Sequence, residues 1–372
     1  MNEMTKRDKS GWQFWVDRGG TFTDLVACRP DGQLVTHKLL SDNPEAYDDA
    51  ALQGIRELMG VASGATLPAE KIDAIKMGTT VATNALLERK GDRTLLVVTR
   101  GFRDQLRIAY QARPRLFDKH IVLPEMLYER IEEVTERVDA NDNVIVPLDL
   151  DDLEPRLQSA YDMGIRAIAI VLMHGYRVTA HEEKIAALAK TIGFSQISTS
   201  HATSPMIKFV GRGDTTVADA YLSPILRRYI DQLATDLDGS AQTKLQMMQS
   251  NGGLTDAGLF QGKDAILSGP AGGIVGAVKT ANQAGFDKVI TFDMGGTSTD
   301  VAHYEGGYER VFDTMVAGVR IHAPMLLIHT VAAGGGSLCR FDNGRFQVGP
   351  ESAGANPGPA CYRRGGPLAV TD

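Results

Sequence analysis

The chain has 372 residues, of which 43% are hydrophobic and 23% are charged, a composition that excludes disordered, collagenous and coiled-coil proteins. Its length favours two domains. The net charge of −7 offers no basic surface for nucleic acid. The polar N-terminus and the lack of an apolar run of about 18 residues predict a cytoplasmic protein without membrane contact. Three widely spaced cysteines predict buried free thiols in a reducing compartment.

Strand and helix patterns alternate along the first 200 residues. Residues 13–17 and 23–28 form a predicted hairpin with a glycine turn. A helix is expected from Asn43 as N-cap, with Pro44 in its first turn, to Gly60. Residues 95–98 and 167–172 have the β-rich apolar composition of buried strands. The alternation predicts an α/β fold with mixed sheets.

A capping box of Thr179 and Glu182 predicts a helix that ends near Gly193. The polar stretch 200–214 then precedes a predicted helix over 215–237, so we place a domain boundary at residue 205. The two expected domains are residues 1–205 and 206–372. Because residues 367–372 resemble the start of an ordered element, the second domain is expected to be incomplete at its C-terminus.

The strongest signal is an internal repeat. The segment DRGGTFTD at residues 17–24 recurs as DMGGTSTD at residues 293–300, 276 positions later (293 − 17), and each copy follows a short hydrophobic run. One D-x-G-G motif alone is often just a tight turn. Two copies, one in each expected domain, suggest paired clamps that face each other across a cleft and close on the phosphates of one nucleotide.

The chemistry of the repeat is that of a phosphate clamp. Glycines let the backbone approach an anion, and their amides and the threonine hydroxyls donate hydrogen bonds. The leading aspartates, Asp17 and Asp293, are placed to hold Mg²⁺ or to orient water. The predicted nucleotide-binding residues are Gly19, Gly20, Thr21, Thr23, Asp24, Gly295, Gly296, Thr297, Thr299 and Asp300. Of these, Asp24 and Asp300 are expected mainly to brace the hairpins.

A clamp between two strands matches neither the Walker loop nor the dinucleotide fingerprint. It resembles the actin, hexokinase and chaperone-ATPase superfamily, which implies two ribonuclease-H-like domains around a cleft. The stretch PAGGIVG at 270–276 resembles the small-residue connecting helix of that superfamily, although it is also an ordinary glycine-tolerant helix start. The segment that resembles the adenosine-binding loop comprises Gly334, Gly335, Gly336 and Ser337.

Several longer motifs resemble one family in order along essentially the whole chain. They include MGTTVATNALLERKG at 77–91, RGDTTVADAYLSP at 212–224, LSGPAGGIVG at 267–276 and VGPESAGANPGPACYRRGGPLAVTD at 348–372. The chain is thereby similar to the ATP-dependent hydantoinases and oxoprolinases. The sequences FWVDRGGTFTD and QARPRLFD favour the 5-oxoprolinase branch. Members of that branch are much longer, so the resemblance implies an N-terminal part of a larger enzyme.

The resemblance implies ATP-driven opening of 5-oxo-L-proline to L-glutamate, with ADP and phosphate as co-products. An unstrained lactam is a poor electrophile, and phosphorylation of its amide oxygen turns that oxygen into a leaving group. The implied ligands are ATP, Mg²⁺ and a small lactam, and the implied partner is the remainder of the enzyme, a B-type domain or subunit, in a homo-oligomer. These 372 residues alone are expected to be inactive. The alternatives are a hydantoinase and a chaperone-like ATP-driven switch.

The predicted substrate residues are less specific. Thr79, Thr80 and Asn84 resemble a helix N-terminus that could bind a carboxylate, but Thr79 is equally suited to be just the N-cap. Arg113 belongs to a basic segment with Arg103, Arg107 and Arg115, which could clamp an anion or simply be solvated. His174 and His181 are expected to be core or capping histidines, with metal ligation as the alternative.

Overall fold

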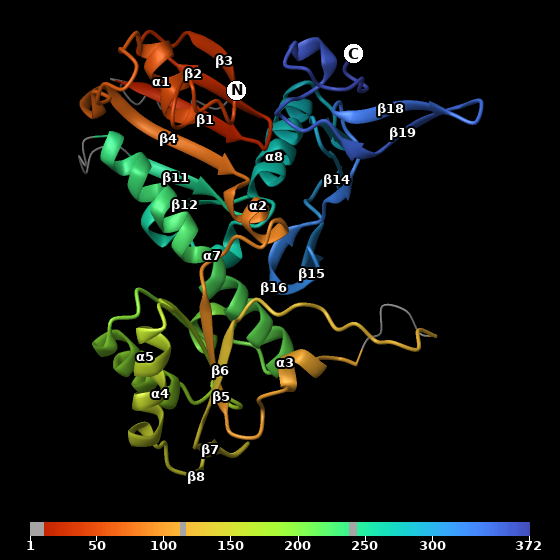
Figure 1. Cartoon of the computed structure of the whole chain (residues 1–372). Coiled ribbons are helices and arrows are strands. Elements are labelled where there is room, and N and C mark those ends of the chain that lie inside the picture. The colour runs from red at the N-terminus through yellow and green to blue at the C-terminus, as the bar shows by residue number, and fades with distance from the viewer. Residues whose placement is uncertain (1–10, 112–116, 238–243) are drawn as a thin grey trace.

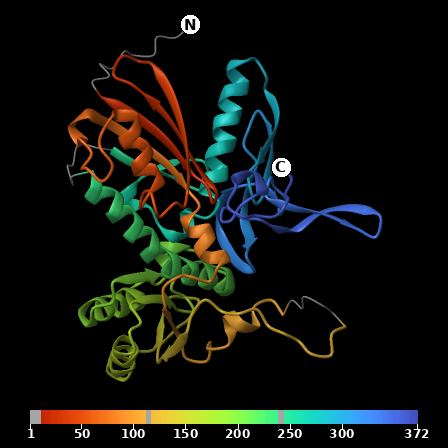
Figure 2. The ribbon, with the colours of Figure 1, turned by 45° about the horizontal axis from the view of Figure 1, so that its top comes forward.

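The computed structural model describes residues 11–111, 117–237 and 244–372. Figure 1 shows three parts: a sheet that contains the first hairpin, a second unit that contains the repeated hairpin, and a lower part built on its own sheet. Helix α8 (Ser268–Gln283) stands between the first two parts, as Figure 2 also shows. Helix α7 (Phe209–Asp236) connects the upper and lower parts.

The first sheet has six strands in the order β12-β11-β4-β1-β2-β3. Strands β1 to β3 form an antiparallel meander, and β4 and β11 continue the sheet in parallel with β1. This arrangement, three antiparallel strands extended by parallel ones, confirms the predicted mixed sheet. The strands are β1 (Trp12–Arg18), β2 (Phe22–Cys28), β3 (Leu34–Leu40), β4 (Ile72–Thr79), β11 (Lys244–Met248) and β12 (Leu254–Asp256).

Helix α1 (Ala50–Met59) covers the first sheet but starts later than expected. The cap is Asp49, whose carboxylate accepts a hydrogen bond from the Leu52 amide at 3.0 Å, and not Asn43. Residues around Asn43 form a separate turn, because Ser41 donates to the Gly19 carbonyl of the first hairpin and Tyr47 donates to the Leu40 carbonyl at the end of β3. The predicted end at Gly60 is correct, and its left-handed φ of 69° explains the glycine.

The lower part is built on a parallel sheet in the order β10-β9-β5-β6. Strands β5 (Thr94–Thr99) and β9 (Ala167–Val171) are completely buried, which confirms the two predicted core strands. Helices α4 and α5 pack against one face, and α3 and α7 pack against the other. The remaining elements are β6 (Arg130–Val134), β7 (Arg137–Val138), β8 (Val144–Val146), β10 (Gln196–Thr199), α3 (Gln105–Ile108), α4 (Leu150–Asp162), α5 (Ala180–Ile192) and α6 (Ser200–Thr203).

Helix α5 begins after Thr179 as expected, but the predicted capping box is wrong. The Thr179 side chain makes no cap hydrogen bond. The buried Glu182 carboxylate instead accepts hydrogen bonds from the Leu172 amide and from Ser200 and His201, since these loop donors lie at the carboxyl end of the sheet.

The expected boundary at residue 205 does not separate the two upper sheets. Helix α7 begins at Phe209, six residues before the predicted helix, and after it β11 and β12 return to the first sheet. Strands of the first sheet therefore come from both before and after residue 205 in the sequence. The lower part is inserted between α2 (Val81–Leu87) and α7.

The second upper unit carries a three-stranded sheet in the order β13-β14-β17 and two further hairpins. Helix α8 packs against β13 on one side and against β4 and β1 on the other, so it joins the two upper units. The strands are β13 (Lys288–Met294), β14 (Thr299–Glu305), β15 (Arg310–Val316), β16 (Val319–Leu326), β17 (His329–Val331), β18 (Ser337–Asp342) and β19 (Arg345–Ser352). Within the described ranges, short 3₁₀ helices cover Ala69–Lys71, Ala257–Leu259, Gly262–Asp264 and Ala360–Tyr362.

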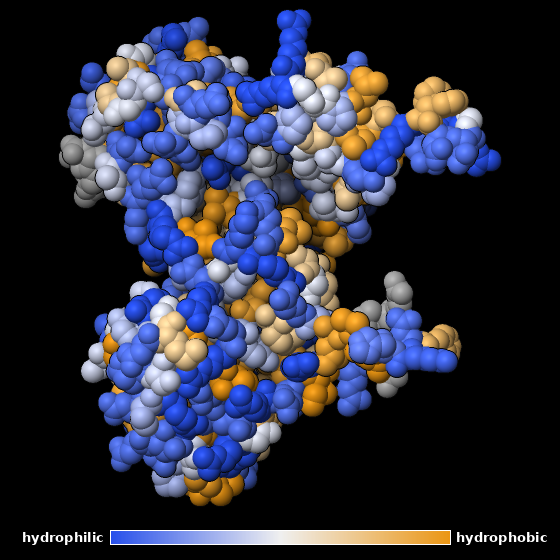
Figure 3. Space-filling model, in the orientation of Figure 1, coloured by the Kyte–Doolittle hydropathy of each residue, from blue (hydrophilic) through white to orange (hydrophobic). Residues whose placement is uncertain are grey.

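Apolar side chains gather at the waist between the upper and lower parts (Figure 3). The three cysteines are free, but only Cys28 is buried, while Cys339 and Cys361 are exposed, which corrects the expectation of buried thiols. Among the helices in the described ranges, none combines the length and the apolar character needed to cross a bilayer.

Candidate nucleotide and phosphate site

The two repeated motifs fold into the same turn. The Gly19 amide donates to the Phe22 carbonyl at 3.0 Å, and the Gly295 amide donates to the Ser298 carbonyl at 2.9 Å. The strand registers match as well, because Asp17 pairs with Asp24 and Asp293 pairs with Asp300. The first glycine amide of each motif is therefore engaged within the turn.

The second glycine amide of each motif is different. Within the described residues, the amides of Gly20 and Gly296 have no hydrogen-bond acceptor. Free amides at the tip of a glycine turn are suitable donors to an anion. The amides available to a phosphate are thus those of Gly20 and Gly296, and not those of Gly19 and Gly295.

The two turns face one shared cavity of about 590 Å³. Their approach is close, since a Cβ atom added to Gly296 would lie only 2.9 Å from the Thr21 hydroxyl oxygen. A glycine is required at this point of contact. Of the predicted nucleotide and substrate residues, those that line the cavity are Asp17, Gly19, Gly20, Thr21, Asp24, Thr80, Asp293, Gly295, Gly296, Thr297, Asp300 and Gly335.

The last threonine of each motif has a structural contact instead. Thr23 is fully buried, and its hydroxyl lies 2.9 Å from that of Ser41, which in turn donates to the Gly19 carbonyl. Thr299 is buried too, and it donates to the Ala333 carbonyl at 2.6 Å. Neither residue lines the cavity, so the predicted phosphate contact does not apply to them. Thr21 and Thr297 remain as the motif threonines that face the cavity.

Asp24 and Asp300 are held by neighbouring strands, as their predicted bracing role requires. The Lys38 ammonium binds Asp24 at 2.7 Å, and the Thr330 hydroxyl donates to Asp300 at 2.6 Å. Burial raises the pKa of Asp300, opposed by the Thr330 hydrogen bond and reinforced by the negative charge of Asp293. Lys38 also lines the cavity, and its place opposite Asp24 in the strand register could have been found from strand alternation.

The two leading aspartates interact across the cavity. The Asp17 side chain reaches the cavity, and its pKa is raised to about 6, chiefly because surrounding protein atoms desolvate the carboxylate. The negative charges of Asp293 and Asp24 contribute to this rise in pKa, and Lys38 opposes it. Because the Asp293 charge disfavours ionisation of Asp17, the two carboxylates form a donor set that a divalent cation would neutralise.

Small residues at the start of α8 make room for both aspartates. A Cβ atom on Gly269 would lie 3.2 Å from Asp17 Oδ1, and one on Gly273 would lie 3.5 Å from Asp293 Oδ2. Gly269 and Pro270 also line the cavity, so the N-terminal end of this 16-residue helix is directed at it. The electropositive end of the helix favours anions there.

The glycine-rich loop after β17 supports the second turn. Gly335 and Gly336 amides donate to the carbonyls of Gly295 and Gly296 at 2.9 and 2.7 Å. A Cβ atom on Gly334 would lie 2.6 Å from the Gly295 carbonyl oxygen, which leaves no space for a side chain. The buried Ser337 hydroxyl accepts from the Gly334 amide. Of the four residues predicted to contact adenosine, just Gly335 lines the cavity.

The predicted substrate residues do not form a separate site. Thr79 is fully buried, and the N-cap of α2 is Thr80. Thr80 faces the shared cavity, and the Asn84 amide donates to its hydroxyl at 3.3 Å. Arg113 and Arg115 lie outside the described residues, and the two other arginines of that segment, Arg103 and Arg107, are exposed.

The histidines do not form a metal site. His181 is buried and its Nδ1 lies 2.9 Å from Glu136, which confirms the expected core histidine. In the ranges that the structure describes, no group of three or more His, Cys, Asp or Glu side chains is placed to hold a metal. Arg18 occupies the second position of the first motif. Its side chain does not line the cavity but contacts Asp49 and the Tyr229 ring.

Comparisons with known proteins agree with this geometry. The family profile of the hydantoinase/oxoprolinase N-terminal region matches residues 13–193, and the hydantoinase/oxoprolinase profile matches residues 212–372. The chain belongs to the hydantoinase/oxoprolinase family. It is 47% identical to 5-oxoprolinase 1 of Arabidopsis thaliana over 97% of this chain and 31% of that protein. It is 42% identical to 5-oxoprolinase of Saccharomyces cerevisiae over 96% of this chain and 31% of that protein.

A solved structure shares the fold. The crystal structure of the ATP-dependent caprolactamase from Pseudomonas jessenii has a TM-score of 0.77 and 32% identity, over 96% of this chain and 54% of that one. The likeness confirms the predicted fold class. This family member spans about a third of the length of the 5-oxoprolinases that it matches.

Proposed function

We propose that the complete protein hydrolyses 5-oxo-L-proline to L-glutamate at the expense of ATP, and that this chain supplies the phosphoryl-transfer site. The observation that carries the proposal is the shared cavity, into which both repeated turns point. The identity of 42–47% to 5-oxoprolinases supports the substrate. The remaining two thirds of such relatives support a partner, a B-type domain or subunit, that acts together with this part.

In this proposal the ATP phosphates lie between the two turns. The free amides of Gly20 and Gly296 and the hydroxyls of Thr21 and Thr297 donate to phosphate oxygens. These groups come from both upper units, so the nucleotide joins them. Positioning and charge neutralisation of this kind are the main requirements of phosphoryl transfer.

Asp17 and Asp293 fit a magnesium ion. Mg²⁺ is usually held by one or two carboxylates together with substrate phosphates and water, and two carboxylates of this cavity repel each other until a cation binds. When bound, Mg²⁺ neutralises charge that develops on the phosphates. The protein's own contribution is to keep both carboxylates at the cavity wall, where Gly269 and Gly273 leave them space.

The chemistry transfers the terminal phosphoryl group of ATP to the lactam oxygen and releases ADP. Water then adds to the activated ring carbon, the ring carbon–nitrogen bond breaks with protonation of the nitrogen, and a second water releases phosphate. Two waters are consumed for each ring opened. The amide and hydroxyl donors of the two turns hold the phosphoryl group in place while the bonds change.

The test is phosphate release from ATP by the complete enzyme. We expect 5-oxoproline to stimulate release and glutamate to appear in equal amount. Stimulation by hydantoins alone would assign the protein to the hydantoinase branch, and stimulation by peptides alone would favour an ATP-driven switch. ε-Caprolactam, the substrate class named for the 32%-identical structure, serves as a lactam without a carboxylate.

A further inference from the structure

The lower part has the topology of a ligand-binding sheet. Its strands are all parallel, and β5 lies between β6 on one side and β9 on the other. Helix α3, which follows β5, lies on the α7 face, whereas α4 and α5 lie on the opposite face. In open sheets of this kind, a crevice forms at the carboxyl ends of the strands where successive connections leave to opposite faces.

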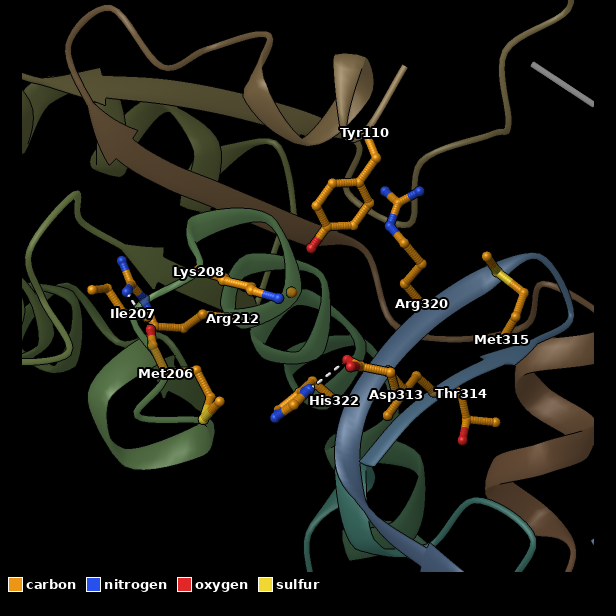
Figure 4. A pocket seen from close by; sticks show the side chains of 12 residues that line it. Tyr110, Met206, Ile207, Lys208, Arg212, Asp313, Thr314, Met315, Arg320 and His322 are labelled. Carbon is orange, nitrogen blue, oxygen red and sulfur yellow. Dashed lines mark hydrogen bonds and ion pairs between the residues drawn. The ribbon is translucent and has the colours of Figure 1, made fainter. Parts of the chain in front are cut away.

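A cavity of about 520 Å³ lies next to this edge (Figure 4), because its lining residue Arg212 donates to the carbonyl of Leu172, which directly follows β9. One wall is Tyr110, from the segment after α3, and a second is the segment 206–212, which leads into α7. The third wall is the β15–β16 hairpin. No residue of this cavity also lines the shared cavity between the two turns, which is called the nucleotide cavity below.

One wall carries a positive charge, that of Lys208, with which no described residue pairs. Within the described residues, Lys208 has no ion-pair or hydrogen-bond partner, and its amine is directed into the space bordered by Tyr110 and His322 (Figure 4). Arg212 is fully buried, donates to the backbone carbonyls of Met206 and Leu172, and lies within the field of the buried Glu182 carboxylate. Its Nε has no partner in the described structure.

The acids near the cavity are already engaged. Asp313 binds Nδ1 of His322, and the buried Asp214 binds Arg320 at 2.6 Å. The Tyr110 hydroxyl makes no hydrogen bond within the described residues. A ligand anion therefore meets free donors at Lys208 and Tyr110, and the exposed Asp313 is the one carboxylate among the described residues that line the cavity.

Apart from Thr314, much of the remaining wall is apolar. Met206, Ile207 and Met315 line the cavity, and all three side chains are exposed. A site with one free ammonium, one free hydroxyl and flexible apolar side chains is suited to a small organic anion with an apolar portion.

We propose that this cavity binds a small organic carboxylate, with its carboxylate on Lys208 and its carbon skeleton on Met206 and Met315. The identity of the ligand rests on the proposed function. Two sources carry the required chemistry, the cyclic amide acid that is the substrate and the open-chain amino acid that is the product. The cavity is a second recognition site, separate from the shared cavity between the two turns in which the proposed function places phosphorylation of the lactam.

Isothermal titration calorimetry of the complete protein without nucleotide tests the proposal. The ligands are 5-oxoproline, glutamate and neutral 2-pyrrolidinone. We expect at least one carboxylate to bind and the neutral lactam to bind about tenfold more weakly or not at all. Which carboxylate binds more tightly identifies the source. Equal binding of the neutral lactam, or no binding of either carboxylate, would overturn the proposal.

Variants locate the binding. Lys208→Met should weaken carboxylate binding about tenfold, Lys208→Arg should retain it, and Lys184→Met on the exposed side of α5 is the matched control. Gly211→Leu fills the cavity without altering charge, since a Cβ atom there would lie 3.7 Å from the Tyr110 hydroxyl. It should abolish binding.

Asp293→Asn separates this inference from the proposed function. It removes a carboxylate of the nucleotide cavity and should leave carboxylate binding unchanged. Loss of binding in Asp293→Asn together with unchanged binding in Lys208→Met would place the carboxylate in the nucleotide cavity and overturn the inference. Failure of lactams to stimulate ATP hydrolysis would instead count against the proposed function alone, because calorimetry here requires no turnover.

Discussion

The two copies of the hairpin share a turn but rest on unequal supports. On β1, Phe14 and Val16 are 0% and 4% exposed, whereas Ile290 and Phe292, which occupy the same positions of β13, are 74% and 71% exposed. Strand β1 lies between β2 and β4, but within the described residues β13 pairs with β14 alone. The turn is therefore set by local sequence, while the burial of each copy depends on the elements that pack around it.

The difference in burial bears on the candidate site, because each strand pair carries one of the two turns that line the shared cavity. If the two halves act together, loss of either leading aspartate should be equally damaging despite the difference in burial. If only the turn on the buried strand β1 acts, Asp293 on the exposed strand β13 should be dispensable.

The largest effect is expected from Asp293→Ala. In the complete enzyme it should lower ATP-dependent turnover by about 100-fold or more, since it removes a charged group from the reacting phosphates. Asp17→Ala should match it. Unfolding should be unaffected by Asp293→Ala, because this side chain is exposed. Asp287→Ala, just before β13, is the control, and near-normal turnover in Asp293→Ala would show that the second turn takes no part.

Core substitutions should separate the two supports. Phe14→Ala should lower the free energy of unfolding by about 3–5 kcal/mol, because it leaves a cavity in a closed core. Phe292→Ala should change it by about 0.5 kcal/mol or less, since the ring is exposed. Urea titration followed by circular dichroism measures both, and similar losses would show that another element covers β13.

Two threonines of the first hairpin, Thr21 and Thr23, should differ in the property that each affects: one nucleotide binding and the other stability. These effects are expected to be smaller than those above. Thr23→Val breaks the buried contact with Ser41 and should cost about 1–3 kcal/mol of folding free energy. Thr21→Val should leave stability nearly unchanged and weaken nucleotide binding, because Thr21 faces the cavity. Thermal unfolding and nucleotide titration distinguish the two, and a stability loss at Thr21 exceeding that at Thr23 would contradict the assignment.

The duplicated hairpin, its strands and the mixed sheet were predictable because strand alternation and glycine turns are local signals. The inward position of Thr23 was predictable too, since it shares the core face of β2 with Leu25. The support of the second turn by Gly335 and Gly336 was not, because it consists of backbone pairing between distant segments. Asn43 and Asp49 are both acceptable helix caps, and only tertiary contacts at Ser41 and Tyr47 decide between them.

The smallest expected effect concerns the charge of Asp17 and its dependence on pH. Desolvation by surrounding protein atoms, followed by the charges of Asp293 and Asp24, raises its pKa to about 6, so the folded protein holds this proton more tightly than the unfolded chain does. The stabilisation that the proton provides is present at low pH and is lost as the pH rises toward 6.

Asp17→Asn removes that pH dependence. The Tm of the nucleotide-free variant should exceed that of the unaltered protein at pH 8, where Asp17 is ionised, by a small amount because the side chain reaches solvent. At pH 4 the two Tm values should coincide, since the protonated acid and the amide are both neutral. Asp287→Asn provides the control at both pH values. A higher Tm for the unaltered protein at pH 8 would mean that the ionised Asp17 is stabilised and that the two aspartates do not repel each other across the cavity.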